Sequence, residues 1–520
     1  MNKVNRNKHQ SYSKGFTIVE LLVVIIVIGI LAAIIVVAYN GIQQQAIAAS
    51  LKSDLNSASK KLELFKVENG VYPSDNVCPV PGVGEICLVA SPGNIFDYHQ
   101  TNSGANYTLS NTNTNTTAYT ITDTNTTPTL VVIAPIIQIS GNRISTGLQT
   151  GCAIGLDSKA YCWGFYAYGA LGNNLAGGNV SSLVAVPVST TGVLSGLTIK
   201  SIATGHNYAC VIASDNKGYC WGENAKGQLG DNSTVNRNVP VAINTAGVLS
   251  GLTLKSISTS NANTCVVASN DKAYCWGWNG YGQVGNVPAA DSSIPAAVSG
   301  TGLVNGLTVK YITTGYTTCA IASDDKAYCW GENTYGQIGN NSTARSNVPI
   351  AVSTAGVLSG KKVTAIATSD DSTCAIADDK AYCWGYNGSG QLGDGSQTER
   401  HIPVAVNGTG LVNGLTVKSI KVSANHTCAI ASDDKAYCWG NNGSGQLGDG
   451  TLIFKKNPIA VDTTGVLNGK TISYITVSNT TTCVATSDYG NYCWGDNSTG
   501  HLGNGSAGNS SVPTAVVGVP

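Results

Sequence analysis

Residues 428–450 read CAIASDDKAYCWGNNGSGQLGDG, and close copies of this stretch recur along most of the chain. A Trp-Gly pair marks each copy, and successive pairs are 58, 55, 54, 54, 55 and 55 residues apart. The seven pairs begin at Trp163, Trp221, Trp276, Trp330, Trp384, Trp439 and Trp494. Each copy contains three or four short apolar runs separated by glycine, which is the content of one propeller blade. The period therefore predicts an all-β repeat domain.

Each copy also carries two cysteines, and their spacing predicts a hairpin. Six pairs are ten residues apart, but Cys374 and Cys383 are nine apart because the segment between them is one residue shorter. Residues that face each other across an antiparallel hairpin stay opposed when the loop shortens, whereas on a helix a shift of one residue rotates them by about 100°. Facing Cα atoms at a non-hydrogen-bonded site lie about 4.5 Å apart, which is within disulfide range. We expect the disulfides Cys152–Cys162, Cys210–Cys220, Cys265–Cys275, Cys319–Cys329, Cys374–Cys383, Cys428–Cys438 and Cys483–Cys493.

A zinc site is the alternative use of these cysteines. Zinc needs four converging ligands, but each copy offers two sulfurs, and only Cys210 and Cys428 have a histidine nearby, at His206 and His426. The total of 16 cysteines is even and suits an oxidising exterior. The pattern favours disulfides, and no metal or other cofactor is predicted.

The segment from Trp439 to Gly450 resembles the regulator of chromosome condensation repeat. That family forms seven-bladed propellers, so the resemblance implies that the seven copies close one ring over residues 138–520. The first copy departs from the pattern, because Phe165 to Gly172 lacks the Asn and the Gln. Residues Val512 to Val517 resemble a strand that the first copy lacks. We therefore expect them to complete the blade that contains Cys152 and Trp163, since an open ring would expose two strand edges.

The amino terminus has a different character. The leader Met1 to Gly15 contains four basic residues and no acid, and nineteen uncharged residues from Leu21 to Tyr39 follow. At about 1.5 Å per residue, a helix over Phe16 to Tyr39 spans roughly 36 Å, enough for a bilayer core of about 30 Å. The positive-inside rule places the leader in the cytoplasm and the rest of the chain outside. Glu20 is the one acid at the edge of this segment and needs a partner in lipid.

The run Gly15-Phe16-Thr17-Ile18-Val19-Glu20 resembles the type IV prepilin signature. The resemblance implies that a prepilin peptidase cuts between Gly15 and Phe16 and that Phe16 is then N-methylated. It also implies that Glu20 neutralises the amino terminus of a neighbouring pilin subunit during assembly. An ordinary signal anchor is the alternative, but it explains neither the Gly before Phe16 nor the position of Glu20.

Residues 40–137 are expected to complete a pilin-type α+β module. The apolar period continues the helix to Asn69-Gly70, and Cys78 and Cys87 enclose a Pro- and Gly-rich loop that a disulfide would clamp. Alternating runs predict a small antiparallel sheet packed on the helix. These runs are Ile95–Tyr98, Asn106–Ser110, Ala118–Thr122 and Leu130–Ile133. The tract Asn111–Thr117 is expected to be a solvated hairpin loop, with glycosylation as an alternative.

Composition and charge exclude several function classes. Charged residues are 11% of the chain and the net charge is zero, or −4 without the leader, so nothing attracts nucleic acid. No nucleophile motif or phosphate-binding loop is present, and the four propeller histidines are scattered at His206, His401, His426 and His501. The paired acids Asp324-Asp325 and Asp433-Asp434 suit tight turns, with calcium binding as the alternative. We predict that the chain is not an enzyme.

These patterns indicate a type IV pilin-like subunit that displays a propeller on the cell surface. The domains are the leader at 1–15, the membrane and assembly helix at 16–39, the pilin remainder at 40–137 and the propeller at 138–520. The subunit would lie in the cytoplasmic membrane before it enters a surface filament, and the propeller would bind an extracellular protein or carbohydrate. The leading alternative is a pseudopilin of a type II secretion or DNA-uptake system, with the propeller in contact with cargo. An exported propeller enzyme is a third, weaker reading.

Overall fold

The computed structural model describes residues 49–68, 71, 94–101, 106–113, 118–122, 129–131, 143–165, 167–175, 181–286, 290–299, 306–407 and 414–520. The chain forms two compact units, Met1–Gln138 and Ile139–Pro520. The leader, the cleavage position Gly15-Phe16, Glu20, the apolar run to Tyr39 and the pair Cys78/Cys87 lie outside the described residues. Within the described part of the chain, no helix is long and apolar enough to cross a membrane.

The first unit contains a helix over residues 49–68 and a four-stranded antiparallel sheet of order β1-β2-β3-β4. Leu51, Leu55, Ala58 and Leu62 are buried on one stripe of the helix, as their spacing of three to four residues requires. The strands are β1 (Asn94–Thr101), β2 (Asn106–Asn113), β3 (Ala118–Thr122) and β4 (Thr129–Val131). Strand β2 extends through Asn113, which pairs with Asn94. The expected loop at Asn111–Thr117 is therefore wrong for its first three residues.

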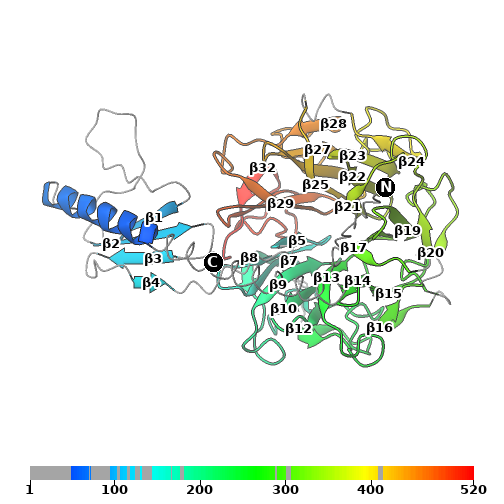
Figure 1. Cartoon of the computed structure of the whole chain (residues 1–520), viewed down its shortest axis with the longest axis horizontal. Coiled ribbons are helices and arrows are strands. Elements are labelled where there is room, and N and C mark those ends of the chain that lie inside the picture. Colours follow the sequence, from blue (N-terminus) through cyan, green and yellow to red (C-terminus); the bar gives the residue numbers. More distant parts are fainter. Residues whose placement is uncertain are drawn as a thin grey trace, which may run out of the picture. The chain divides into compact units, whose positions relative to one another are not determined.

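The second unit is a seven-bladed β-propeller, and Figure 1 shows its sheets arranged around a ring. Each blade is a four-stranded antiparallel meander of consecutive strands. The first blade is β5 (Ile144–Thr146), β6 (Thr150–Ile154), β7 (Ala160–Phe165) and β8 (Ser181–Pro187), with a short 3-10 helix η2 (Ala167–Gly169) after β7. The second is β9 (Ile199–Thr204), β10 (Tyr208–Ala213), β11 (Gly218–Gly222) and β12 (Arg237–Ala242). The third is β13 (Leu254–Thr259), β14 (Asn263–Ala268), β15 (Ala273–Gly277) and β16 (Ser292–Ala297).

The remaining blades repeat this order. The fourth is β17 (Val309–Thr314), β18 (Thr317–Ala322), β19 (Ala327–Gly331) and β20 (Ser346–Ala351). The fifth is β21 (Val363–Thr368), β22 (Ser372–Ala377), β23 (Lys380–Gly385) and β24 (Arg400–Ala405). The sixth is β25 (Val417–Val422), β26 (His426–Ala431), β27 (Ala436–Gly440) and β28 (Lys455–Ala460). The seventh is β29 (Ile472–Val477), β30 (Thr481–Thr486), β31 (Asn491–Gly495) and β32 (Ser510–Ala515).

The repeat cysteines face each other across the second and third strands of every blade. Cys428 is the register partner of Cys438, and the shortened fifth blade keeps Cys374 opposite Cys383. All seven pairs form disulfides, with Cα atoms 4.0–4.1 Å apart. The missing residue of the fifth blade falls in the turn, where Asp378 and Asp379 take positive φ values of 46° and 59°. The one-residue difference in spacing is therefore absorbed by the turn, and the hairpin register is kept.

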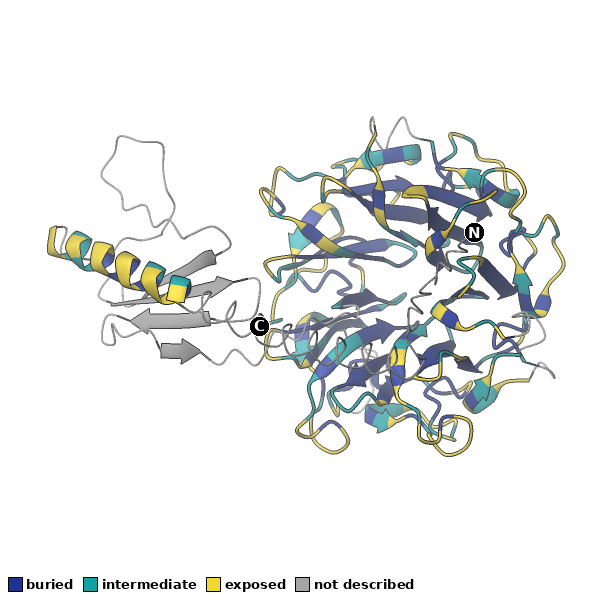
Figure 2. Ribbon diagram, in the orientation of Figure 1, coloured by how far each residue is buried: buried dark blue, intermediate teal, exposed yellow. Residues whose placement is uncertain are grey.

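The apolar core lies between neighbouring blades. Figure 2 shows buried strands throughout the ring and exposed connecting loops. One cluster joins Ile430 and Leu447 of the sixth blade to Ile475 and Trp494 of the seventh. Gly448 lets these blades meet, because a Cβ at this position would lie 2.5 Å from Nε1 of Trp494. The repeated Gly of one blade thus packs directly against the repeated Trp of the next blade.

The ring does not close in the expected way. Strand β32 pairs with β31 of the seventh blade, through Tyr492 with Ala515 and Gly495 with Ser510. The first blade is completed instead by its own β8. The prediction that Val512–Val517 completes the first blade is therefore wrong. The residues just beyond β32 do reach that blade, because the amide of Ala185 donates to the carbonyl of Val517 at 2.9 Å and the amide of Leu156 donates to that of Pro520 at 2.9 Å.

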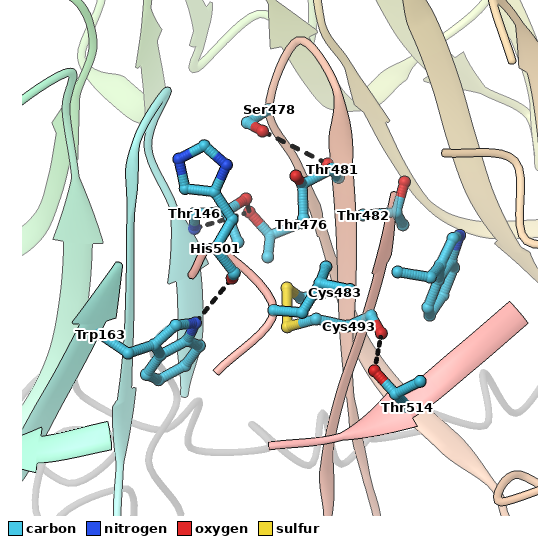
Figure 3. The surroundings of a disulfide bond; sticks show 12 residues. Thr146, Trp163, Thr476, Ser478, Thr481, Thr482, Cys483, Cys493, His501 and Thr514 are labelled. Carbon is cyan, nitrogen blue, oxygen red and sulfur yellow. Dashed lines mark hydrogen bonds between the residues drawn. A yellow bond between two sulfur atoms is a disulfide. The ribbon is translucent and has the colours of Figure 1, made fainter. Parts of the chain in front are cut away.

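Side chains also join the first and last blades. Figure 3 shows the indole of Trp163 aimed at the carbonyl of His501, beside the Cys483–Cys493 disulfide. The hydroxyls of Thr146 and Thr476 lie 3.2 Å apart across the same seam. Closure therefore uses contacts between complete blades, together with the terminal residues.

Candidate ligand-binding surface

The loops on one face of the propeller carry a surface that the repeat positions. In an antiparallel four-stranded blade, the first and third strands run in the same direction and end at the same face. The loops after these strands therefore lie together in every blade. In the third, fourth and fifth blades, five half-buried aromatic residues occupy them, and we call these residues the aromatic surface. They are Trp278, Tyr281, Tyr316, Tyr335 and Tyr386.

Three rings of the aromatic surface pack edge to face. The ring centroids of Trp278 and Tyr281 lie 4.9 Å apart, those of Trp278 and Tyr316 5.5 Å, and those of Tyr281 and Tyr316 5.3 Å. Their planes cross at 66–73°, the arrangement that ring quadrupoles favour. Trp278 and Tyr281 come from the third blade and Tyr316 from the fourth, so the cluster bridges two blades.

Arg345 and Glu332 extend the cluster along the fourth blade. The guanidinium carbon of Arg345 lies 4.3 Å from the centroid of the Tyr281 ring, and Arg345 pairs with the buried carboxylate of Glu332 at 2.7 Å. Burial opposes the charge of Glu332, but hydrogen bonds from Thr334 and Arg345 outweigh it and lower the pKa of the carboxyl. The guanidinium is thereby held flat on an aromatic face, a geometry suited to cation–π attraction.

A second ring pair continues the surface toward the fifth blade. The rings of Tyr335 and Tyr386 lie 4.9 Å apart. The amide of Tyr386 donates to the carbonyl of Asp371 at 2.9 Å, and the amide of Glu332 donates to that of Tyr316 at 3.0 Å. These backbone bonds tie the loop after each third strand to the loop after the first strand of the same blade.

Two acids lie where the aromatic surface meets the centre of the ring. Asn261 donates its amide to Asp370 at 2.9 Å. Burial raises the pKa of Asp370 to about 6, and the neighbouring Asp371 adds to the shift against the effect of the Asn261 hydrogen bond. Burial, with the charge of Glu332, also raises the pKa of Asp371. Asn261 and Asp370 line a cavity of ≈ 120 Å³ at this end of the channel.

The repeated asparagine holds the loops after the third strands, which carry every member of the aromatic surface except Tyr316. Asn333 accepts a hydrogen bond from the amide of Ile338 at 2.8 Å and donates to the carbonyls of Ser342 and Ala344 at 2.9 and 2.8 Å. Asn279 and Asn387 make equivalent bonds in the neighbouring blades. A buried amide with its hydrogen bonds made holds a loop in one conformation. The aromatic residues therefore stand on rigid supports.

Comparison with known families finds matches in both parts of the chain. Regulator of chromosome condensation (RCC1) repeat models match residues 215–267, 270–322, 324–376 and 378–430, and a second model of this repeat matches 199–228, 254–283, 363–391 and 417–446. The prokaryotic N-terminal methylation motif matches residues 10–36. The chain joins a prokaryotic methylation motif to an RCC1-repeat propeller.

Individual proteins are similar to this chain in sequence or in structure. The Ultraviolet-B receptor UVR8 of Arabidopsis thaliana is 28% identical over 324 residues, which are 62% of this chain and 69% of the receptor. The E3 ubiquitin-protein ligase HERC2 of Homo sapiens is 29% identical over 356 residues, which are 66% of this chain but 7% of the ligase. Among solved structures, human WBSCR16 has a TM-score of 0.59 at 20% identity, covering 69% of this chain and 94% of that one. Yeast RCC1 bound to Kap60 has a TM-score of 0.56 at 19% identity, covering 68% and 81%. These structural likenesses establish the fold.

The aromatic surface occupies positions at which the RCC1 repeats differ. The position of Trp278, directly after the Trp-Gly pair, is Glu223 in the second blade, Asn441 in the sixth and Asp496 in the seventh. Our sequence reasoning missed the surface because it followed what the copies share. Alignment of the seven copies would have shown aromatic residues at these variable positions in the third, fourth and fifth blades, and also in the first blade at Phe165 and Tyr168.

The residues predicted from sequence as alternative metal sites are separate in the RCC1-repeat propeller. Asp325 pairs with Lys310, and Asp324 accepts a hydrogen bond from Tyr328 at 2.9 Å. His426 is buried between Ser423 and Thr482, at 3.1 and 2.8 Å, and burial lowers its pKa to about 3. Across the described residues, no three His, Cys, Asp or Glu side chains converge as metal ligands. These residues give no sign of a catalytic site.

Proposed function

We propose that the protein is a type IV pilin-like subunit whose RCC1-repeat propeller is an extracytoplasmic binding module. The observation that carries this proposal is the methylation motif at residues 10–36 on the same chain as the propeller. A prepilin peptidase would cut between Gly15 and Phe16, and Glu20 would then pair with a neighbouring subunit. The helix from Phe16 would hold the protein in the cytoplasmic membrane until it enters a surface filament.

The disulfides of the propeller support export. Cytosolic reductants keep most thiols reduced, so a domain with one disulfide in each of its seven blades suits an oxidising exterior. A propeller in that compartment is separated from nuclear and cytosolic partners. What UVR8 or HERC2 does therefore gives no guide to the ligand here.

The aromatic surface is the proposed contact with an extracellular ligand. Trp, Tyr and Arg are the residues enriched in binding hot spots. Here Trp278, Tyr316 and Arg345 lie 4.3–5.3 Å from the ring centroid of Tyr281. Their supporting loops are fixed by buried amides, so little ordering entropy opposes binding. The composition favours a protein ligand, and a carbohydrate is the other outcome that the experiment distinguishes.

Imaging tests the filament part of the proposal. An antibody against the propeller should label long surface fibres in intact cells. Label confined to the envelope would favour the alternative, a pseudopilus of a secretion or DNA-uptake system.

Adhesion assays test the binding part. Cells that carry Tyr281→Ala with Tyr316→Ala should bind their target less well at unchanged filament number. The control is Tyr168→Asn, because Tyr168 is half exposed at the same repeat position in the first blade, and Asn tolerates its positive φ of 59°. Adhesion that survives removal of the whole propeller would refute the binding role, and loss of adhesion after protease or glycosidase treatment of the target would identify the ligand class.

A further inference from the structure

The interior of the propeller channel contains a second site, separate from the aromatic surface. The first strands of the blades enclose a cavity of ≈ 260 Å³, and its wall is mainly serine and threonine. No Asp or Glu is among the described residues that line it. The wall thus offers hydroxyl groups without negative charge.

Two lysines interrupt this hydroxyl lining: Lys255, which pairs with Asp271 at 2.5 Å, and Lys421. Lys421 in β25 is the register partner of Cys428. The other six blades fill this position with Ser145, Ala203, Ser258, Thr313, Ala367 and Thr476. A long cationic side chain replaces a small residue in one blade, and it lies inside the channel. An inward-facing charge among small repeat residues is costly unless something interacts with it.

The partners of Lys421 are aromatic hydroxyls and not carboxylates. Its Nζ lies 5.4 Å from the ring centroid of Tyr474, and its other neighbour is Tyr311 from the fourth blade. Burial works against the ammonium, but the oxygens of Tyr311 and Tyr474 outweigh it, and the pKa of Lys421 lies above its usual value. Among the described residues, no carboxylate forms an ion pair with Lys421. The side chain is therefore a cation at neutral pH with no counter-ion from the described protein.

Three buried hydroxyls in the same cavity also lack partners. Oγ of Ser201, Oγ of Ser256 and Oγ1 of Thr259 make no hydrogen bond within the described chain. Buried polar groups in native proteins are nearly always hydrogen-bonded, so these three oxygens show that the wall near Lys421 is incompletely satisfied. They are closed off from solvent and would reach a ligand only after their side chains rotate. All three line the cavity that contains Lys421.

We propose that the channel binds a small oxyanion-bearing ligand, a carboxylate, phosphate or sulfate of monosaccharide size or less. Lys421 supplies the positive charge for the anionic oxygens, and the hydroxyls of Tyr311 and Tyr474 donate to them. Serine and threonine hydroxyls of the wall contact the remaining polar atoms of the ligand. Asp370 lines the other cavity, and its carboxylate disfavours entry of anions from the aromatic face.

A ring of seven residues, one from each blade, lines both cavities. Its members are Thr146, Thr204, Thr259, Thr314, Thr368, Val422 and Val477. This arrangement gives the channel a cationic compartment on one side of the ring and an acidic mouth on the other. The anion site is independent of the aromatic surface, so either proposal can fail without the other.

Calorimetry with the full-length oxidised protein in detergent tests the site. Sodium glucuronate should bind with one site per chain, and glucose should not bind. Sulfate and phosphate alone separate the two sources of the anion. If sulfate or phosphate binds as tightly as glucuronate, the ligand is an inorganic anion. If both bind more weakly than glucuronate, the ligand is an anionic sugar.

Lys421→Met should weaken binding of glucuronate by about tenfold or more, because hydrogen bonds to a charged group are lost. Lys421→Arg should retain most of it.

Lys418→Met is the matched control. Lys418 lies on the same strand but is exposed and pairs with Asp434 at 2.6 Å, so its replacement should leave anion affinity unchanged. Wild-type affinity in Lys421→Met, equal binding of glucose and glucuronate, or no binding of any of these anions at millimolar concentration would each refute the proposal. If Lys421→Met fails to fold, comparison of glucuronate with glucose on the wild-type protein still tests whether binding requires an anionic group.

Discussion

The indole Nε1 of Trp163 donates a hydrogen bond to the backbone carbonyl of His501, 2.7 Å away and 338 residues along the chain. The same bond joins every other pair of neighbouring blades at 2.9–3.0 Å. Its acceptors are the carbonyls of Ala170, Gln228, Gln283, Gln337, Gln391 and Gln446. The closure of the ring is therefore one more copy of the interface that the repeat uses throughout.

Replacement of Trp163 by Phe should weaken this closure. The smaller ring leaves a void and leaves the carbonyl of His501 without its donor, which together should lower the free energy of unfolding by about 2–4 kcal/mol. Denaturant unfolding of the full-length protein, followed by tryptophan fluorescence, measures the change. Trp278→Phe is the control, since Trp278 is half-buried in a loop and makes no such bond among the described residues. Equal midpoints for the two variants would contradict the role of Trp163.

The residues after β32 should also contribute to closure. Deletion of 517–520 leaves β32 intact but removes the carbonyls that accept from Ala185 and Leu156. Val519 also packs against the cluster that contains Ile144 and Trp163. We expect a loss of about 1–3 kcal/mol, seen as a lower melting temperature and more aggregation. An unchanged melting curve would mean that the contacts between complete blades suffice.

The hairpins could be predicted from sequence because two independent signals agreed. The Trp period gave the number of blades, and the shortened spacing of Cys374 and Cys383 separated a hairpin from a helix. The sequence could not show in the same way where one blade ends and the next begins. A strand that lies between one Trp-Gly pair and the first strand of the next copy can pair with either blade. The ladder from Tyr492–Ala515 to Gly495–Ser510 assigns β32 to the blade before it.

The two candidate binding sites could not be predicted from the sequence for a different reason. Tyr281 and Tyr316 are far apart in the repeat and become neighbours only when two blades pack. Lys421 and Tyr311 belong to blades that are not adjacent in the ring, and the channel brings them together. The pilin-type head stays a prediction, since its expected disulfide and its assembly helix fall outside the described residues.

Non-reducing peptide mapping of the secreted or membrane-extracted protein should find each repeat cysteine linked to its hairpin partner. Replacement of both Cys374 and Cys383 by Ser should cost at most about 3 kcal/mol, because the loop they close is short and the strands already restrain it. The same double change at Cys428 and Cys438 is a control for position in the ring. Links between different blades would contradict the register of the hairpins.

Replacement of Glu20 by Gln should separate processing from assembly. The residue lies beyond the cut, so the mature chain should still begin at Phe16 with a methylated amino group, as intact mass shows. Its charge is useful only opposite a cationic partner in lipid, so filament yield should fall. Asp54→Asn, in the helix over residues 49–68, is a control for loss of one acidic charge. Normal filament yield from the Glu20 variant would remove the assembly role.

The carboxyl of Asp370 should make the stability of the propeller depend on pH. Burial raises its pKa to about 6, above the ordinary 3.8, so the folded state holds a proton that the unfolded state loses first. Stability contributed by the protonated form is therefore present below pH 3.8 and is lost as pH rises to about 6, by at most about 3 kcal/mol. Asp370→Asn keeps an acceptor for the amide of Asn261 and has no charge to bury. It should melt at a higher temperature than wild type at pH 7.5, and the two melting temperatures should converge near pH 4.

Asp215→Asn is the matched control, because Asp215 lies in a surface turn where it accepts a hydrogen bond from Tyr219 at 2.7 Å. A constant difference in melting temperature between the Asp370 variant and wild type from pH 4 to 7.5 would show that ionisation of this carboxyl does not destabilise the fold.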